Sequence, residues 1–405
     1  MSQQLKTSQA GAKQPMSAAL LWTMAIACGI SVANLYYSQP LLADIGRTFE
    51  TGANQVGVVS MLTQVGYALG MLFFIPLGDI RERRRLIVGL STAVSLALVG
   101  VALAQNIVWL ALASLVVGIT TVVPQVIVPF AADLAVAQER GKVVGSVMSG
   151  LLVGILLART VSGFIGNWFG WRAMYWLAAI LMLLLAICLR MLLPKNEPNI
   201  ALPYRELMQS VWTVAKQQPM LWEASLMGGA LFGAFSVFWT TLAFFLEYPP
   251  YHFGSNIVGL FGLVGVVGAS VAPFSGRMAD RWGARSVAGI ATVITLIAYL
   301  VLWSSGQRLW GLVLGVILLD AGIQGAQISN QATIFSLVPE ASNRINTVYM
   351  VSYFIGGALG SSLGAAAWSA GKWSGVCILG IGMTVLALIT WLMGRTSRRQ
   401  AWRTV

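Results

Sequence analysis

Long apolar runs follow one another along the chain from Ala18 to Gly394, and we count twelve of them. A helix needs about 20 apolar residues to cross the hydrocarbon core of a bilayer. Only 9% of the 405 residues are charged, whereas a soluble domain has about 25%. Because a chain inside lipid must satisfy its backbone hydrogen bonds internally, the sequence predicts an all-α membrane protein with twelve transmembrane helices. The predicted spans cover residues 18–42, 54–76, 84–105, 107–133, 141–168, 171–193, 220–246, 256–276, 285–304, 308–337, 343–368 and 373–394.

The longest polar link carries four prolines and divides the spans into six plus six. The two groups resemble each other, because a shift of 201 residues aligns Asp79 with Asp280 and a shift of 204 aligns Arg140 with Arg344. Chance similarity among apolar helices is the alternative. Since charged landmarks coincide as well, we predict two pseudo-symmetric six-helix bundles. The expected parts are an N-terminal tail, a first bundle, a linker, a second bundle and a C-terminal tail, over residues 1–17, 18–193, 194–219, 220–394 and 395–405.

Basic residues concentrate on one side of the predicted membrane. Twenty of the 25 fall at alternate junctions between spans, starting with the N-terminal tail, and only four fall at the opposite junctions. Short loops rich in Lys and Arg stay in the cytoplasm, so we expect a multi-pass inner-membrane protein with both termini cytoplasmic. The same placement argues against a nucleic-acid partner, despite a net charge of +12.

Residue types that build metal sites and disulfides are scarce. Cys28, Cys188 and Cys377 lie in separate apolar runs, and the single histidine, His252, lies in a loop. Neither a disulfide framework nor a metal cluster fits this usage. No nucleotide-binding loop or catalytic triad is visible either, so we expect no cofactor, no metal and no enzymatic activity.

Two charged residues lie deep inside predicted spans. Arg159 stands about nine residues before the outer end of the fifth span, and Asp320 about twelve residues after the outer end of the tenth. At 1.5 Å per residue these depths are roughly 14 and 18 Å. A charge at mid-bilayer costs about 2.5–3.5 kcal/mol and marks a functional site by default. The two residues are expected either to form a buried ion pair or each to face a wet cavity.

Polar side chains also form rows inside four spans. Gln324, Gln327 and Gln331 follow Asp320 at i+4, i+7 and i+11, which places all four on one helical face. Hydrogen bonding between helices explains any single amide, but four coincident rows favour a substrate cavity. The other rows are Asn34, Tyr37, Ser38 and Gln39 in the first span, Thr121 and Gln125 in the fourth, and Ser236, Trp239 and Thr240 in the seventh.

Two loops resemble the cytoplasmic signature of the major facilitator superfamily, G-x-x-x-D-R-x-G-R-R. The loop after the second span reads PLGDIRERRR over residues 76–85, and the loop after the eighth reads GRMADRWGAR over residues 276–285. The resemblance implies a fold of two six-helix bundles whose first, fourth, seventh and tenth helices line the cavity. It also implies a cytoplasmic gate formed by Asp79, Arg81, Arg84, Asp280, Arg281 and Arg285.

The fifth span resembles the glycine-rich motif of drug:proton antiporters in the same superfamily, G-x8-G-x3-G-P-x2-G-G. Gly145, Gly154 and Gly163 keep the spacing, but Arg159 stands where the family has proline. In the fourth span Ser114 stands where the antiporters have arginine. One hypothesis is therefore that Arg159 takes over the role of the missing arginine.

Together these features favour a secondary transporter that works by alternating access. A carboxylate that moves between wet and desolvated settings changes its proton affinity, so Asp320 is the expected proton-coupling residue, with Arg159 modulating it. The resemblance favours export of a drug, sugar or metabolite by proton antiport. Proton-coupled import is the alternative, and a membrane sensor or scaffold without transport is a further one. The expected partners are a small-molecule substrate, protons and the lipid bilayer, and we expect a monomer because each bundle supplies the interface of the other.

Overall fold

The computed structural model describes residues 16–136, 138–196, 203–337 and 342–401. Every regular element in this part of the chain is helical, which confirms the predicted all-α class. Ten of its helical segments are long and apolar enough to cross a membrane. One of the ten, Arg344–Gly394, is two helices that meet at non-helical backbone at Gly371 and Lys372. With the shorter apolar helix Ala18–Ala33, the described chain provides a helix for each of the twelve predicted spans.

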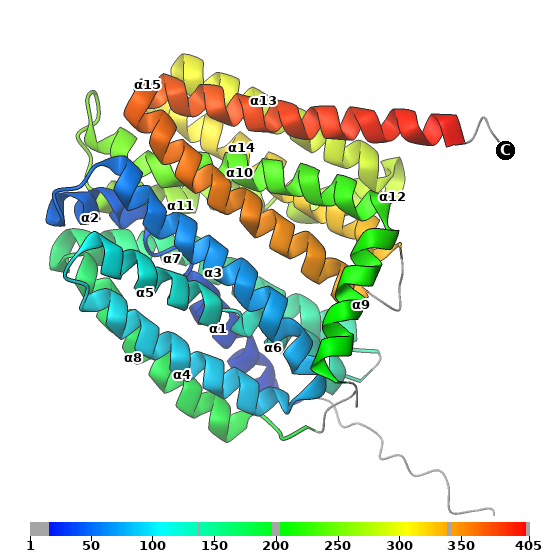
Figure 1. The fold of residues 1–405 in the computed structure, drawn as a ribbon. Coiled ribbons are helices and arrows are strands. Elements are labelled where there is room, and N and C mark those ends of the chain that lie inside the picture. The colour runs from blue at the N-terminus through cyan, green and yellow to red at the C-terminus, as the bar shows by residue number, and fades with distance from the viewer. Residues whose placement is uncertain (1–15, 137, 197–202, 338–341, 402–405) are drawn as a thin grey trace, which may run out of the picture.

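The helices before the predicted linker run back and forth between two ends of the bundle (Figure 1). We call these the α2 end and the α9 end, after the short helix and the linker helix that mark them. Before the linker the elements are α1 (Ala18–Ala33), η1 (Gln39–Leu41), α2 (Leu42–Thr48), α3 (Ala53–Ile80), α4 (Arg83–Ala102), α5 (Ile107–Thr120), α6 (Val123–Leu134), α7 (Arg140–Phe169) and α8 (Trp171–Leu192). After it come α9 (Tyr204–Gln217), α10 (Pro219–Glu247), α11 (Ser255–Ala269), α12 (Ala272–Trp282), α13 (Ala284–Ser305), α14 (Leu309–Phe335) and α15 (Ser342–Ala401).

Two of the predicted spans are interrupted helices. The first breaks after Ala33, where backbone hydrogen bonds tighten to i→i−3, and it resumes at η1 with Pro40. The fourth breaks between α5 and α6 at Thr121 and Val122, next to Pro124. Proline lacks an N–H and cannot continue the helical hydrogen bonding. In transporters such discontinuous helices commonly surround the binding site.

Glycines spaced four apart bring pairs of helices into backbone contact. A Cβ added at Gly154 in α7 would stand 2.2 Å from the carbonyl oxygen of Gly29 in α1. A Cβ at Gly360 in α15 would stand 2.1 Å from the carbonyl oxygen of Gly233 in α10. Only glycine permits these approaches, which give van der Waals packing where no hydrophobic driving force acts between helices.

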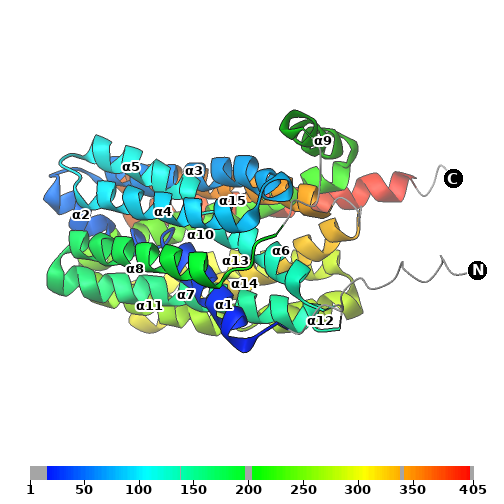
Figure 2. The same cartoon turned by 90° about the horizontal axis from the view of Figure 1, so that it is seen from below.

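The linker contains a helix that the sequence analysis did not predict. α9 buries Leu207, Val211 and Ala215, which lie on one face at i, i+4 and i+8. It contacts α3, α10 and α15 and lies beside the bundle at one end (Figure 2). The hydroxyl of Tyr204 donates to the carbonyl oxygen of Phe73 in α3. The helix therefore touches elements on both sides of the linker.

Two arginines make matching contacts in the two parts of the chain. Arg84, at the start of α4, donates to the carbonyl oxygen of Arg190 in α8. Arg285, at the start of α13, donates to the carbonyl oxygen of Trp391 in α15. Donor and acceptor both shift by 201 residues, the shift that aligns Asp79 with Asp280. These contacts support the predicted repeat, while the division into two six-helix domains stays a prediction.

Helices from opposite sides of the linker pack closely toward the α2 end. In α3, a Cβ at Gly57 would stand 2.4 Å from the Cβ of Ala365 in α15. In α7, a Cβ at Gly163 would stand 3.0 Å from the Cα of Gly259 in α11. Toward the α9 end of α7, a Cβ at Gly145 would meet nothing within 4 Å. The described helices are therefore packed shut near the α2 end.

Candidate functional site

Arg159 lies in the middle of α7, and only 2% of its surface is exposed. Its Nε donates to Oε1 of Gln39 at 2.6 Å. Three aromatic rings surround the guanidinium, with the centroids of Trp239, Tyr36 and Phe235 at 4.0, 4.8 and 5.6 Å from Cζ. A desolvated cation–π contact stabilises the structure by about 2 kcal/mol or more. Since two of the rings belong to α10, Arg159 joins helices on opposite sides of the linker.

Asp320 lies on α14 and is 3% exposed. Its carboxylate packs against α11, where a Cβ at Gly265 would stand 3.3 Å from both carboxylate oxygens. A Cβ at Gly268 would stand 2.8 Å from the Cβ of Asp320. The two glycines thus let α14 bring the carboxylate against α11. One oxygen, Oδ2, is buried and has no hydrogen-bond partner.

Arg159 and Asp320 contact the same helix one turn apart. A Cβ at Gly262 in α11 would stand 2.9 Å from the Cβ of Arg159, and the next turn, at Gly265, meets Asp320. The two charges act on each other electrostatically, but no nitrogen of Arg159 lies within the 4.0 Å of a carboxylate oxygen that defines an ion pair. Nη2 of Arg159 is buried without a hydrogen-bond partner. The direct ion pair, one of the two arrangements expected from the sequence, is therefore not formed.

The glutamine row on α14 turns toward the first half of α15. Gln324, Gln327 and Gln331 are half-buried. Oε1 of Gln327 accepts from the hydroxyl of Tyr353 at 3.3 Å, and Nε2 of Gln331 lies 3.8 Å from Sδ of Met350. The amides of Gln327 and Gln331 therefore face a neighbouring helix of the protein, as polar groups at bilayer depth require.

The predicted cavity residues of the first and fourth spans lie at the helix breaks. Asn34, Tyr37 and Ser38 are buried in the segment between α1 and η1, and Oδ1 of Asn34 has no partner. Thr121 is fully buried at the break between α5 and α6, and its hydroxyl has no partner. Nε2 of Gln125 donates to the hydroxyl of Tyr67 at 3.1 Å. Buried polar atoms without partners call for an explanation such as water or a ligand.

The three predicted cavity residues of α10 divide between two surroundings. Trp239 packs on Arg159, as described above. Ser236 and Thr240 instead join a buried hydrogen-bond cluster with α3 and α15. In it Nε2 of Gln64 donates to Oγ of Ser361 at 2.7 Å, Ser236 donates to Oε1 of Gln64 at 3.3 Å, and Thr240 donates to Ser361 at 3.0 Å. We call these four residues the polar cluster, and it links helices from both sides of the linker.

At the α9 end, Arg83, which is not among the predicted gate residues, makes two ion pairs. Its Nη1 lies 2.6 Å from Oδ2 of Asp133 and its Nη2 lies 3.6 Å from Oδ1 of Asp79. Asp79 also interacts electrostatically with Arg344 at the start of α15, across the linker. Arg81 is exposed. The gate role proposed for these residues stays a prediction.

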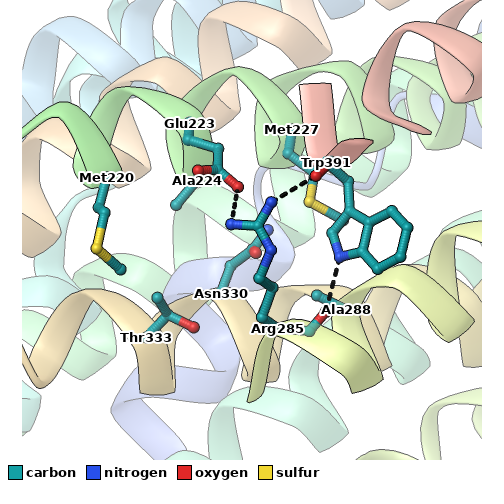
Figure 3. Close-up of a pocket in the computed structure, with 9 residues that line it drawn as sticks. All are labelled: Met220, Glu223, Ala224, Met227, Arg285, Ala288, Asn330, Thr333 and Trp391. Atoms are coloured by element: carbon teal, nitrogen blue, oxygen red, sulfur yellow. Dashed lines mark hydrogen bonds and ion pairs between the residues drawn. The ribbon is translucent and has the colours of Figure 1, made fainter. Parts of the chain in front are cut away.

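The second predicted gate loop is arranged differently. Asp280 and Arg281 are exposed, and the turn after them has Gly283 at φ +83°, a conformation that favours glycine. Arg285 points into a small cavity of about 20 Å³, where its Nη1 lies 2.6 Å from Oε1 of Glu223 (Figure 3). Nε1 of Trp391 donates to the carbonyl oxygen of Arg285 at 2.9 Å. Arg285 thus ties α13 to α10 and α15.

Several residues of the site were not singled out from the sequence. Tyr36 and Phe235 are adjacent to predicted cavity residues, but aromatic residues are common in apolar spans and carry no signal of their own. Gln64 is a polar residue inside an apolar span and could have been found by the reasoning that found Gln125.

The comparisons with known proteins agree with this architecture. The sequence profile of the Major Facilitator Superfamily matches residues 24–273 and again residues 250–404. The relative named "Uncharacterized transporter YgaY" of Escherichia coli O157:H7 is 41% identical over 379 residues, 94% of this chain and 96% of its own. The "Probable sugar efflux transporter" of Helicobacter acinonychis is 24% identical over 345 residues, 80% of this chain and 82% of its own.

A similar fold is found in the crystal structure of a bacterial homolog of the human lysosomal transporter Spinster, in an inward-facing and unoccupied conformation. It superposes with a TM-score of 0.76 at 16% identity, over 93% of this chain and 97% of that one. The helical architecture, the family profile and the relatives agree: this chain belongs to the Major Facilitator Superfamily, whose members are secondary transporters of small molecules.

Proposed function

We propose that the protein exports a small organic molecule in exchange for protons, by alternating access in the inner membrane. Both chain termini are cytoplasmic in this proposal, because the α9 end carries the excess of basic residues. The protein acts as a monomer, with the six-helix bundles before and after the linker moving against each other around a central site.

The observation that carries the proposal is the pair of buried opposite charges that contact neighbouring turns of α11. Arg159 and Asp320 are each at least 97% buried, and each keeps one polar atom without a partner. Burial of a charge without full hydrogen bonding costs free energy. The presence of two such charges therefore indicates a functional role. In the proposed cycle Asp320 binds a proton on one side of the membrane and releases it on the other, and Arg159 sets how tightly the proton is held.

In this proposal the structure described above is closed on the outer side of the membrane, which is the α2 end. The close contacts of α3 with α15 and of α7 with α11 lie toward the α2 end, and there Arg47 also pairs with Glu247 of α10. Opening of this end would separate the polar cluster. Asp79, Arg81, Arg84, Asp280, Arg281 and Arg285 are proposed as the gate of the α9 end, with Arg83 added because it holds both Asp79 and Asp133.

Export is favoured by the glycine-rich motif of α7 and by the relative named as a sugar efflux transporter. Proton-coupled uptake is the second candidate. The observation in its favour is Arg159, which replaces the proline of the antiporter motif and is held by three rings and Gln39.

The test uses purified protein in liposomes with an imposed pH gradient, screened against labelled drugs, sugars and amino acids. Accumulation inside the liposomes driven by outward proton flow identifies antiport, and accumulation driven by inward proton flow identifies symport, as uptake requires. Asp320→Asn is expected to abolish the gradient-driven component and to leave exchange without a gradient. Glu206→Gln, an exposed carboxylate on α9, is the matched control. Full pH-driven accumulation by the Asp320→Asn protein would remove Asp320 from the mechanism.

A further inference from the structure

Arg159 and Asp320 contact neighbouring turns of α11 without forming an ion pair. Arg159 meets α11 at Gly262 and Asp320 meets it at Gly265, three residues later. Side-chain positions at i and i+3 on a helix are about 5–6 Å apart. The two charged groups are more than 4.0 Å apart, so they are too far for an ion pair. Because a hydrogen bond joins heavy atoms at about 2.7–3.2 Å, any hydrogen-bonded connection between the two side chains must pass through an intervening group.

The two unpartnered atoms specify what such an intervening group must do. Nη2 of Arg159 can only donate, and Oδ2 of an ionised Asp320 can only accept. The bridge must therefore accept from one side and donate to the other. A carboxylate cannot donate and an ammonium group cannot accept, whereas a hydroxyl oxygen does both.

The surroundings favour an uncharged molecule. The charges of Arg159 and Asp320 cancel, so the pair attracts neither a net cation nor a net anion. The other ionisable groups close to Asp320 are the phenols of Tyr36 and Tyr353, which are buried. Aromatic side chains dominate the surroundings, with Phe232 stacked on Tyr353 at 4.1 Å between ring centroids. Such surroundings suit an apolar or aromatic body.

We propose that Arg159 and Asp320 together bind a hydroxyl group of a neutral, hydroxylated substrate, which accepts from Nη2 of Arg159 and donates to Oδ2 of Asp320. This inference rests on the proposed function and specifies its substrate class. It also gives a reason for antiport, because a proton on Asp320 removes the ionised acceptor and thereby weakens substrate binding. Proton and substrate then occupy the site in alternation.

The experiment measures binding to purified wild-type protein by calorimetry, without any pH gradient. The probes share a phenyl group: phenyl β-D-glucopyranoside, its tetra-O-methyl ether, 2-phenylethylamine and 3-phenylpropanoate. The glucoside is expected to bind at least 10-fold more tightly than each of the others, because the ether cannot donate and the ions lack either a donor or an acceptor. No binding of the glucoside, or equal or tighter binding of any other probe, overturns the proposal; in the first case the gap holds water alone.

Variants test the assignment to these two side chains. Asp320→Asn keeps an acceptor oxygen but no charge, so binding of the glucoside should weaken about 10-fold and lose its dependence on pH. Arg159→Met should weaken it by a similar factor, and Glu206→Gln should leave it unchanged. Unchanged affinity in correctly folded Asp320→Asn and Arg159→Met proteins, judged by gel filtration, overturns the proposal. Failure of the proposed proton coupling is distinguishable, because it would leave this selectivity intact while liposome transport ignored the pH gradient.

Discussion

Replacement of Gln64 by methionine tests whether the polar cluster holds the α2 end closed. Gln64 lies in α3 and is 6% exposed. Its amide donates to Ser361 in α15 and accepts from Ser236 in α10. Methionine has a similar length and no branching but cannot replace these hydrogen bonds, so the change removes two bonds between helices on opposite sides of the linker.

The expected magnitude follows from those two bonds. Hydrogen bonds between membrane helices average about 0.6 kcal/mol and reach about 1.7 kcal/mol. Two of them therefore stabilise the closed arrangement by roughly 1–3 kcal/mol. When the α2 end opens, the amide of Gln64 would form hydrogen bonds with water and lose little free energy. Since 1.4 kcal/mol is a factor of ten, Gln64→Met should shift the population toward opening at the α2 end by about tenfold.

Distances between two spin labels would measure the shift. Gln55 on α3 and Ala370 on α15 are exposed near the α2 end, so cysteines placed there carry the labels without disturbing the core. The native Cys28, Cys188 and Cys377 are unpaired and must first be replaced. The expected result is a larger fraction of long distances in the Gln64→Met protein than in its parent.

Gln125→Met is the matched control. Its amide is half-buried and bonds to Tyr67, which lies on the same side of the linker, so its loss should not move the two halves of the chain apart. Identical distance distributions in the Gln64→Met protein and its parent would show that the polar cluster does not hold this end closed. An equal shift in both variants would show a general loss of packing instead.

Three further outcomes are expected. Gly265→Ala should lower substrate affinity several-fold in the binding assay, because its Cβ would stand 3.3 Å from the carboxylate oxygens of Asp320. Gly356→Leu should lower the melting temperature in detergent by several degrees or prevent folding, because its Cβ would stand 2.1 Å from a backbone oxygen of α10; an unchanged melting temperature would refute the close crossing. Gln64→Met combined with Asp320→Asn should change the free energy of opening, obtained from the spin-label populations, by an amount that differs from the sum of the single changes by more than about 0.5 kcal/mol, and an additive result would show that the two sites act independently.

The spans and the helix crossings could be predicted because they depend on local properties of the sequence. A run of apolar residues long enough for the bilayer is visible without knowledge of its neighbours. The four-residue spacing of Gly356 and Gly360 likewise identifies a contact face. The depth of Arg159 and Asp320 followed from counting residues along each span, which is why both were recognised although 161 positions separate them.

The partners of these residues could not be predicted, because they depend on how distant helices are placed. Gln64 and Ser361 are 297 positions apart, and no property of either residue identifies the other. The sequence does not single out Arg83, because the same loop contains four arginines and only the fold decides which of them reaches Asp133. The linker helix α9 has a regular apolar face, but the prolines and charged residues of this segment predict only a polar link.

The site and the closed α2 end share a single helix, and this offers a physical route from binding to conformational change. Ser236 and Thr240 lie one turn apart on α10 and bond to the polar cluster, while Trp239, between them in sequence, packs on Arg159. Any change in the position of the guanidinium therefore acts on the same turn of α10 that contributes two hydroxyls to the cluster. Because packed helices have few alternative arrangements, a small displacement of Trp239 is expected to favour either the bonded or the broken cluster. Binding at Arg159 and Asp320 can then bias the two states through their differential contacts with α10, which is the condition that any ligand must meet to shift a conformational equilibrium.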